Sequence, residues 1–170
     1  RLAVLYNEEG KTKFFVYDMV NRTKLWKQEI DKFDQVQDMK YMLDNNTLLF
    51  SAVRSGQTDI YVYKLDKQSF EQVTNDVYDD LDPSFVAFPN KTGILFSSNR
   101  PTEKAASSDD SLPARHFNIF LADNWNKSEF KQISRLTNLK RGNARFPSQY
   151  NQSHFTFVSD EIENTGAQCF

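Results

Sequence analysis

The chain has 170 residues, of which 39% are hydrophobic and 26% charged, so it is long enough for a sizeable core and is neither a disordered tail nor a membrane segment. Its 21 basic and 23 acidic residues give a net charge of −2, and without a basic stripe nucleic acid is an unexpected partner. The single cysteine, Cys169, excludes an internal disulfide and a cysteine-built zinc site.

Short apolar and aromatic runs separated by polar turns follow one another along the chain. They lie at residues 2–6, 13–18, 23–28, 47–51, 59–63, 70–74, 93–97, 118–121, 130–136 and 155–159. The 15 phenylalanines and 7 tyrosines, many beside Val, Ile and Thr, favour half-buried strands. No stretch has convincing 3.6-residue periodicity, so we predict an all-β protein with very little helix.

These runs repeat. An apolar strand that ends in serine occurs at Ser51, Ser97 and Ser159, and the first two serines are about 46 residues apart. Four strands in that length are typical of a propeller blade, since WD40-type repeats take ~40–45 residues. The longer spacing to Ser159 comes mainly from an insertion at residues 101–116. We therefore predict a partial β-propeller of about three to four four-stranded blades.

The predicted blades cover residues 1–30, 31–75, 76–140 and 141–170, and the first and last are incomplete. The second strand of a blade is sandwiched between neighbouring blades, so both of its faces should be apolar. Residues 48–50 (LLF) and 94–96 (ILF) have this composition, and each follows a polar turn.

Several motifs resemble the PD40 (WD40-like) repeat of TolB-like propellers. They are residues 80–85 (DLDPSF), the turn at 90–93 (NKTG), 94–100 (ILFSSNR), 59–61 (DIY) and 72–74 (QVT). In the last blade the sequence departs from the family pattern, because residues 145–148 (RFPS) stand where the family has Asp-Pro. The matches span almost the whole chain and are more specific for the fold than for the function.

Propellers close with four to eight blades, which removes exposed sheet edges. The chain corresponds to about 3.7 units of this repeat. We therefore expect it to be completed by further blades of the same or another chain, with a signal or anchor upstream.

Catalytic motifs are not apparent. Serine hydrolases of the α/β type need a G-x-S-x-G elbow with a histidine and an acid, and the sequence has no such elbow. The two histidines, His116 and His154, are interpreted as structural or surface residues. We predict no catalytic residue, no cofactor and no bound metal.

Four aspartates, Asp76, Asp79, Asp80 and Asp82, precede a predicted strand. Hard cations such as Ca²⁺ prefer several oxygen ligands, but the spacing does not match a D-x-D-x-D-G loop. We favour a structural role in which these carboxylates accept hydrogen bonds from turn amides. Asp82 is the best candidate for holding the fold, with Arg100 as its paired charge.

The insertion indicates a binding face. In an up-and-down blade the connections alternate between two faces, so residues 101–116 should lie beside 75–82 and 139–143. Insertions on one face of a repeat array are often the binding face, although a merely disordered loop is an equal alternative. The candidate partner-binding residues are Asp79, Asp80, Arg100, Glu103, Lys104, Asp109, Asp110, Arg115, His116 and Trp125.

Three functions remain open. The resemblance implies a non-catalytic scaffold that binds other proteins in the bacterial envelope or periplasm and does not itself span the membrane. The alternative is the propeller domain of a prolyl-oligopeptidase-like peptidase whose catalytic domain lies outside this segment. A sugar- or metal-binding propeller would need ligand groups that converge at the central channel.

Overall fold

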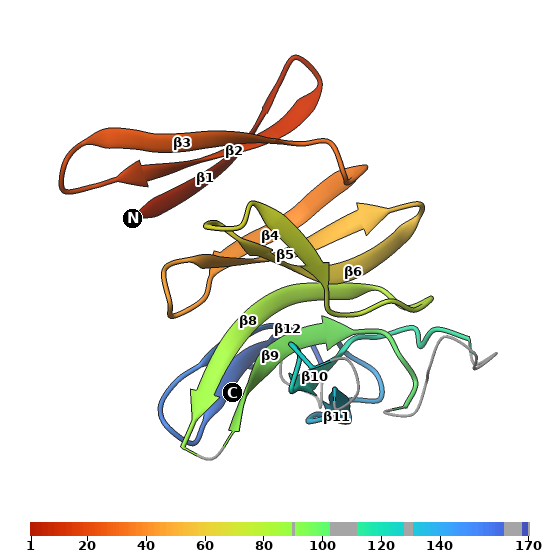
Figure 1. Ribbon diagram of the computed structural model, residues 1–170. Coiled ribbons are helices and arrows are strands. Elements are labelled where there is room, and N and C mark those ends of the chain that lie inside the picture. The colour runs from red at the N-terminus through yellow and green to blue at the C-terminus, as the bar shows by residue number, and fades with distance from the viewer. Residues whose placement is uncertain (90, 103–111, 128–130, 162–167, 170) are drawn as a thin grey trace.

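The computed structural model describes residues 1–89, 91–102, 112–127, 131–161 and 168–169, and it contains four antiparallel sheets stacked in chain order (Figure 1). The first sheet comprises β1 (Leu2–Glu8), β2 (Lys11–Asp18) and β3 (Thr23–Ile30). The second comprises β4 (Gln35–Tyr41), β5 (Thr47–Arg54), β6 (Gln57–Lys64) and β7 (Ser69–Gln72). The third comprises β8 (Asp80–Phe88), β9 (Lys91–Ser98), β10 (Asn118–Asp123) and β11 (Gln132–Arg135). The fourth comprises β12 (Ala144–Gln149), β13 (Phe155–Ser159) and β14 (Gln168–Cys169).

These sheets are blades. Each strand pairs antiparallel with its sequence neighbour, and the second and third sheets are four-stranded in the orders β4-β5-β6-β7 and β8-β9-β10-β11. The predicted all-β partial propeller is therefore confirmed. No helix occurs in the described part of the chain, so none there could cross a membrane.

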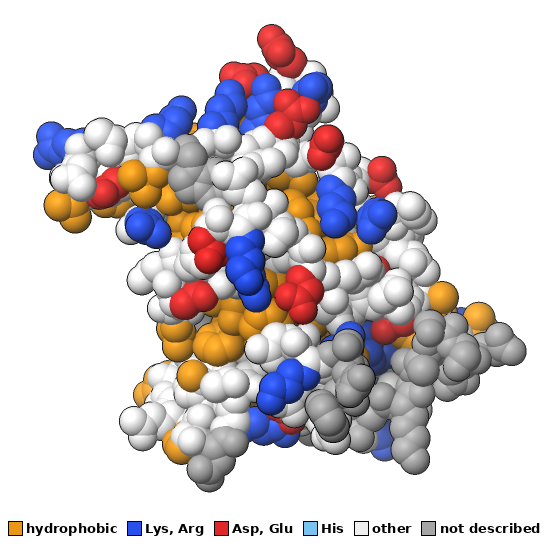
Figure 2. All heavy atoms as spheres, viewed as in Figure 1, with side chains coloured by type: hydrophobic (Ala, Val, Ile, Leu, Met, Phe, Trp, Pro, Cys, Tyr) orange, Lys and Arg blue, Asp and Glu red, His pale blue; other side chains and the backbone are white. Residues whose placement is uncertain are grey.

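Hydrophobic side chains fill the spaces between blades. Alternate residues of β5 point to opposite sides: Leu48 and Phe50 pack toward the first blade, whereas Leu49 packs toward the third. The side chains of β9 alternate in the same way, since Phe96 packs toward the second blade and Leu95 toward the fourth. The prediction that these strands are buried on both faces is confirmed, because both are largely buried along their lengths. Figure 2 shows that some hydrophobic side chains also reach the surface between the blades.

The inner strands are irregular at equivalent positions. The pairing of β8 shifts between Leu81 and Ser84, and that of β12 shifts between Arg145 and Ser148. Within these bulges, Asp82 and Phe146 have positive φ angles of 54° and 55°. A β-bulge bends its strand and re-aims its side chains. The two bulges therefore determine which side chains face the propeller axis.

The connections alternate between two ends of the blades. We call the end with the β5–β6, β7–β8, β9–β10 and β11–β12 connections the loop end, and the opposite end, with the β4–β5, β8–β9 and β10–β11 connections, the turn end. At the loop end the amide of Phe117 donates to Oδ1 of Asn143 at 3.0 Å, and the amide of Asn99 donates to the carbonyl of Asp79 at 3.4 Å. The ends of the β9–β10 insertion therefore lie beside both inter-blade connections, as predicted.

Candidate functional site

The loop end is anchored where the insertion begins. Besides the bond between the Asn99 amide and the Asp79 carbonyl, the amide of Asp79 donates to Oδ1 of Asn99 at 2.9 Å. Nδ2 of Asn99 donates in return to the Asp79 carboxylate at 3.2 Å. Asp79 is exposed. This reciprocal pairing therefore holds one surface carboxylate in place at the loop end.

Beneath this pair lies a buried ionic cluster centred on Arg100, which is 1% exposed. Its Nη2 donates to Oδ2 of Asp76 at 3.0 Å and to both oxygens of Asp80 at 2.9 and 2.7 Å. Its Nε donates to Oγ of Ser98 at 2.9 Å. The guanidinium thus joins the β7–β8 connection to the ends of β8 and β9. A buried charge of this kind is tolerated only when it is paired and hydrogen-bonded.

Aromatic rings enclose the guanidinium. The centroids of Phe96, Phe120 and Tyr78 lie 5.2, 5.5 and 5.9 Å from Cζ of Arg100. Rings at these distances attract a cation through their quadrupoles and keep water away from it. Lysine could not reproduce this arrangement, because its ammonium lacks the planar fork that bonds several acceptors at once.

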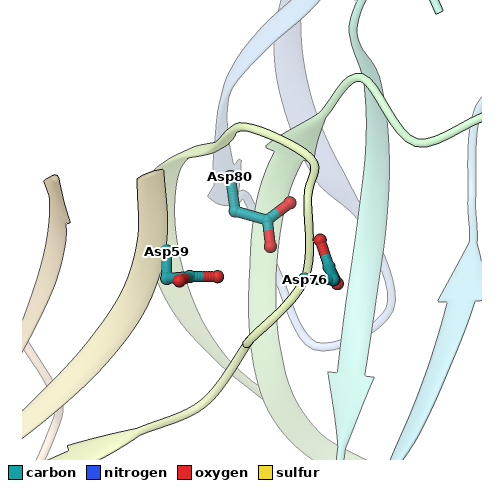
Figure 3. Close-up of side chains that lie close together, drawn as sticks. All are labelled: Asp59, Asp76 and Asp80. Atoms are coloured by element: carbon teal, nitrogen blue, oxygen red, sulfur yellow. The ribbon is translucent and has the colours of Figure 1, made fainter. Parts of the chain in front are cut away.

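A third carboxylate, that of Asp59 at the start of β6, faces the same space (Figure 3). One oxygen atom from each of Asp59, Asp76 and Asp80 lies within 4.8 Å of the others. Asp59 itself accepts bonds from neutral donors, Nε2 of Gln72 at 3.0 Å and Oγ1 of Thr74 at 3.2 Å. It is thus the carboxylate of the three that has no hydrogen bond from Arg100 among the described contacts.

The cluster shifts the acidity of its members. Burial raises the pKa of Asp59 to about 7, and repulsion from Asp80 and Asp76 adds to this effect. Burial also raises the pKa of Asp80 to about 6, although the charge of Arg100 opposes it. The Nζ atom of Lys131 donates to the carbonyl of Val73 close by. Burial lowers its pKa, although the attraction of Asp76 opposes this. Burial thus moves the pKa values of Asp59 and Asp80 toward neutral pH.

The four aspartates considered for calcium do not converge on one point. Asp76 and Asp80 bind Arg100, Asp79 binds Asn99, and Asp82 faces the next blade. A guanidinium already lies between the first two, so a divalent cation there would be repelled by it. Of the four, Asp76 accepts a bond from a turn amide, that of Tyr78 at 3.1 Å, and the structural interpretation of the aspartates stays a prediction.

The predicted pairing of Asp82 with Arg100 is wrong. Asp82 instead accepts from Nε and Nη2 of Arg145 at 2.5 and 3.1 Å, from the amide of Phe146 at 3.2 Å, and from Oγ of Ser97 at 2.9 Å. The bulge at Asp82 turns its carboxylate toward the fourth blade, away from the space that Arg100 occupies. Burial raises the pKa of Asp82, but these donors outweigh it and hold that pKa below its usual value.

A polar pocket of about 530 Å³ opens on the inner strands. Its lining includes Asp38 and Lys40 from β4, Asp82 from β8, and Arg145 and Phe146 from β12. β8 contacts both of the other inner strands, so the three strands lie side by side around the propeller axis. Polar groups from three successive blades thus converge at the channel side. Asp79 also lines this pocket, which connects the pocket to the loop end.

The binding residues predicted from the sequence do not form one surface in the structure. Asp79 and Arg115 are exposed at the loop end and His116 is half-buried there, whereas Asp80 and Arg100 are buried beneath it. Trp125 lies in the β10–β11 connection at the turn end, so it does not share a face with the others. Glu103, Lys104, Asp109 and Asp110 lie outside the described residues.

Sequence reasoning missed Asp59 in the buried cluster and Arg145 in the channel. The repeat could have indicated the first, because Asp59 and Thr74 are equivalent to Asn118 and Thr137 one blade later. Oγ1 of Thr137 donates to Oδ1 of Asn118 at 2.9 Å, as Thr74 does to Asp59. The same hydrogen bond from threonine is therefore accepted by a titratable residue, Asp59, in the second blade and by a neutral one, Asn118, in the third.

Stacked antiparallel blades whose inner strands surround an axis define a β-propeller protein. The crystal structure of TolB from Acinetobacter baumannii is similar, with a TM-score of 0.58 and 16% sequence identity over 98% of this chain. The chain corresponds to 39% of the length of that TolB chain. No protein-family model and no curated protein matches the sequence. The likeness to TolB establishes a TolB-like propeller fold, and the finer assignment to PD40 repeats stays a prediction.

Proposed function

We propose that this propeller is a non-catalytic module that binds protein partners through the channel-side pocket and the adjoining loop end. The observation that carries the proposal is the convergence of polar and aromatic side chains from three blades on one concave surface. Folds of this type accommodate many functions, so the composition of this surface, and not the fold, indicates what the protein binds.

The pocket combines charges of both signs with one accessible ring. Nζ of Lys40 lies 3.6 Å from the Asp38 carboxylate, and the side chains are 37% and 34% exposed. Phe146, which is 56% exposed, lies beside the partly exposed guanidinium of Arg145. Arginine and aromatic residues are enriched where protein interfaces concentrate their binding energy. The pocket suits a polar segment of polypeptide that inserts one apolar side chain against Phe146.

We propose the bacterial envelope as the setting, as the repeats imply. The proposal of protein binding does not depend on that location, because it derives from the composition of the pocket. A partner that inserts a charged segment should bind less tightly at high salt, since partly exposed charges are screened.

The test is a photo-crosslinker placed at Lys40 in the full chain, exposed to envelope extract of the source cell. We expect a discrete crosslinked protein that is absent when the crosslinker replaces Lys24, which is exposed on the outer strand β3. The variant Phe146→Asn should weaken capture at least about tenfold, because removing a central aromatic residue costs ~2 kcal/mol or more. Asparagine tolerates positive φ better than phenylalanine, so the bulge at this position should persist.

The matched control is Val20→Asn, which removes an apolar side chain that is 88% exposed in the β2–β3 connection. Equal loss of capture in both variants would refute the channel-side pocket as the site. Equal crosslinking from positions 40 and 24 would refute it as well.

A further inference from the structure

A second pocket, of about 420 Å³, lies at the turn end, opposite to the loop end and away from the function proposed above. It lies between the second and third blades. Its walls are the β4–β5 connection with Met42 and Leu43, the β10–β11 connection with Trp125, and the third blade at Phe85 and Thr92. Its volume falls within the ~300–1,000 Å³ that small-molecule sites usually have.

The apolar part of the lining of this turn-end pocket, which we call its floor, consists of Met42, Phe85 and Trp125. Phe85 and Trp125 both pack against the buried cluster that fills the space between the second and third blades, and Met42 belongs to that cluster. The connection that carries Trp125 begins with a turn at residues 124–127, in which the amide of Lys127 donates to the carbonyl of Asn124 at 2.8 Å. The indole therefore lines the pocket from a fixed position.

The rim of the pocket is polar. The side chains of Asn124, Asn126 and Lys127 are exposed at the pocket and form no hydrogen bond with another described residue. In contrast, the carboxylate of Asp44 is already engaged, because it accepts from the amides of Asn46 and Thr47 and from Oγ1 of Thr47. The rim thus offers two amides and an ammonium above an aromatic floor.

We propose that the turn-end pocket binds a pyranose sugar. One face of a pyranose ring carries C–H groups that stack on an aromatic surface, while its hydroxyls need donors and acceptors around the edge. Trp125 and Phe85 supply the surface, and Asn124, Asn126 and Lys127 supply the edge. A purely apolar side chain would satisfy the floor but would remove water from the rim amides without replacing their hydrogen bonds, which is unfavourable.

Tryptophan fluorescence provides the readout. The sequence has two tryptophans, and the variant Trp26→Phe leaves Trp125 as the sole emitter. The full chain carrying this change is titrated separately with β1,4-linked tetrasaccharides of glucose and of N-acetylglucosamine and with tetragalacturonate. We expect at least one to change the Trp125 emission saturably, with a Kd of about 1 mM or tighter.

Two variants locate the site. Asn126→Ala should weaken binding of the same sugar at least about fivefold, equivalent to roughly one lost hydrogen bond. Trp125→Ala, followed by calorimetry, should abolish it. The matched control is Asn138→Ala, since Asn138 is exposed at the loop end of the same blade. Far-ultraviolet circular dichroism and melting curves check that each variant is folded.

Three outcomes would overturn the proposal. The first is that none of the sugars produces a saturable change in emission. The second is that a leucine-rich peptide saturates the Trp125 signal while the sugars do not, which would make the pocket an apolar docking site. The third is that the sugar binds Asn126→Ala and Trp125→Ala as tightly as the unchanged chain, which would place the sugar elsewhere.

Discussion

Replacing Asp59 with asparagine should remove a large part of the pH dependence of stability. Its pKa is raised from 3.8 to about 7 in the folded protein, so between these pH values the folded chain holds more protons than the unfolded chain. The free energy of unfolding must therefore fall as pH rises through this window and level off above it. The stabilising contribution is complete at low pH and is lost as Asp59 ionises.

The magnitude follows from the same linkage. A full proton of difference changes stability by about 1.4 kcal/mol per pH unit. Partial screening by the surrounding polar groups reduces this, and we expect about 0.5–1 kcal/mol per unit. Over the roughly three pH units between pH 3.8 and 7 this amounts to about 1.5–3 kcal/mol, so at pH 8 Asp59→Asn should be more stable than the unchanged chain by that amount, because it removes a buried charge that has no hydrogen-bonded cation among the described contacts. Near pH 4, close to the unfolded pKa of 3.8, the two should be nearly equal.

Asparagine should fit without rearrangement, because Asn118 occupies the equivalent position one blade later and accepts the corresponding bond from Thr137. The assay is urea unfolding followed by fluorescence at intervals from pH 4 to pH 8. The control is Asp31→Asn, since Asp31 is exposed in the β3–β4 connection. Parallel stability curves for Asp59→Asn and the unchanged chain would refute the reasoning, as would an equal flattening in the control.

Two further substitutions test the ion pairs of Arg100 and the close contact between β9 and β10 at Gly93. Arg100→Met should destabilise the fold by about 3–5 kcal/mol in urea unfolding, because Asp76 and Asp80 would remain buried without their cation; a loss below about 1 kcal/mol would contradict the assigned pairing. Gly93→Ala should cost about 1–3 kcal/mol, because its Cβ would lie 2.7 Å from the carbonyl oxygen of Ala122 on the neighbouring strand. An unchanged thermal midpoint in Gly93→Ala would show that the two strands separate freely at that point.

The fold was predictable because its signal is repeated and local. The apolar runs in β5 and β9 have the composition of strands buried on both faces, and the structure places them between blades. The alternation of connections predicted which loops share an end, and hydrogen bonds at Asn99 and Phe117 confirm it. The same rule places Trp125 at the other end, so its grouping with the loop-end residues was avoidable.

The partners of individual charges were not predictable in the same way. Asp76, Asp80 and Asp82 lie close together in the sequence, and any of them could have been assigned to Arg100. The choice depends on a bulge that turns Asp82 toward Arg145, 63 residues away. Bulges have weak sequence signals, because one extra residue in a strand leaves the overall apolar pattern unchanged. The repeat could have indicated the bond between Asp59 and Thr74, but the approach of Asp76 and Asp80 to Asp59 depends on the next connection and strand.

The bond between Asp82 and Arg145 also has a consequence during synthesis. Ribosomes add about 5–20 residues per second, so the 63 residues that separate the two side chains take roughly 3–13 s to appear. During that interval the third blade can form its own strand pairs. The carboxylate of Asp82 has no ion-pair partner until Arg145 has been synthesised. The third blade of a nascent chain should therefore form its strands before the fourth blade supplies the ion pair that holds Asp82.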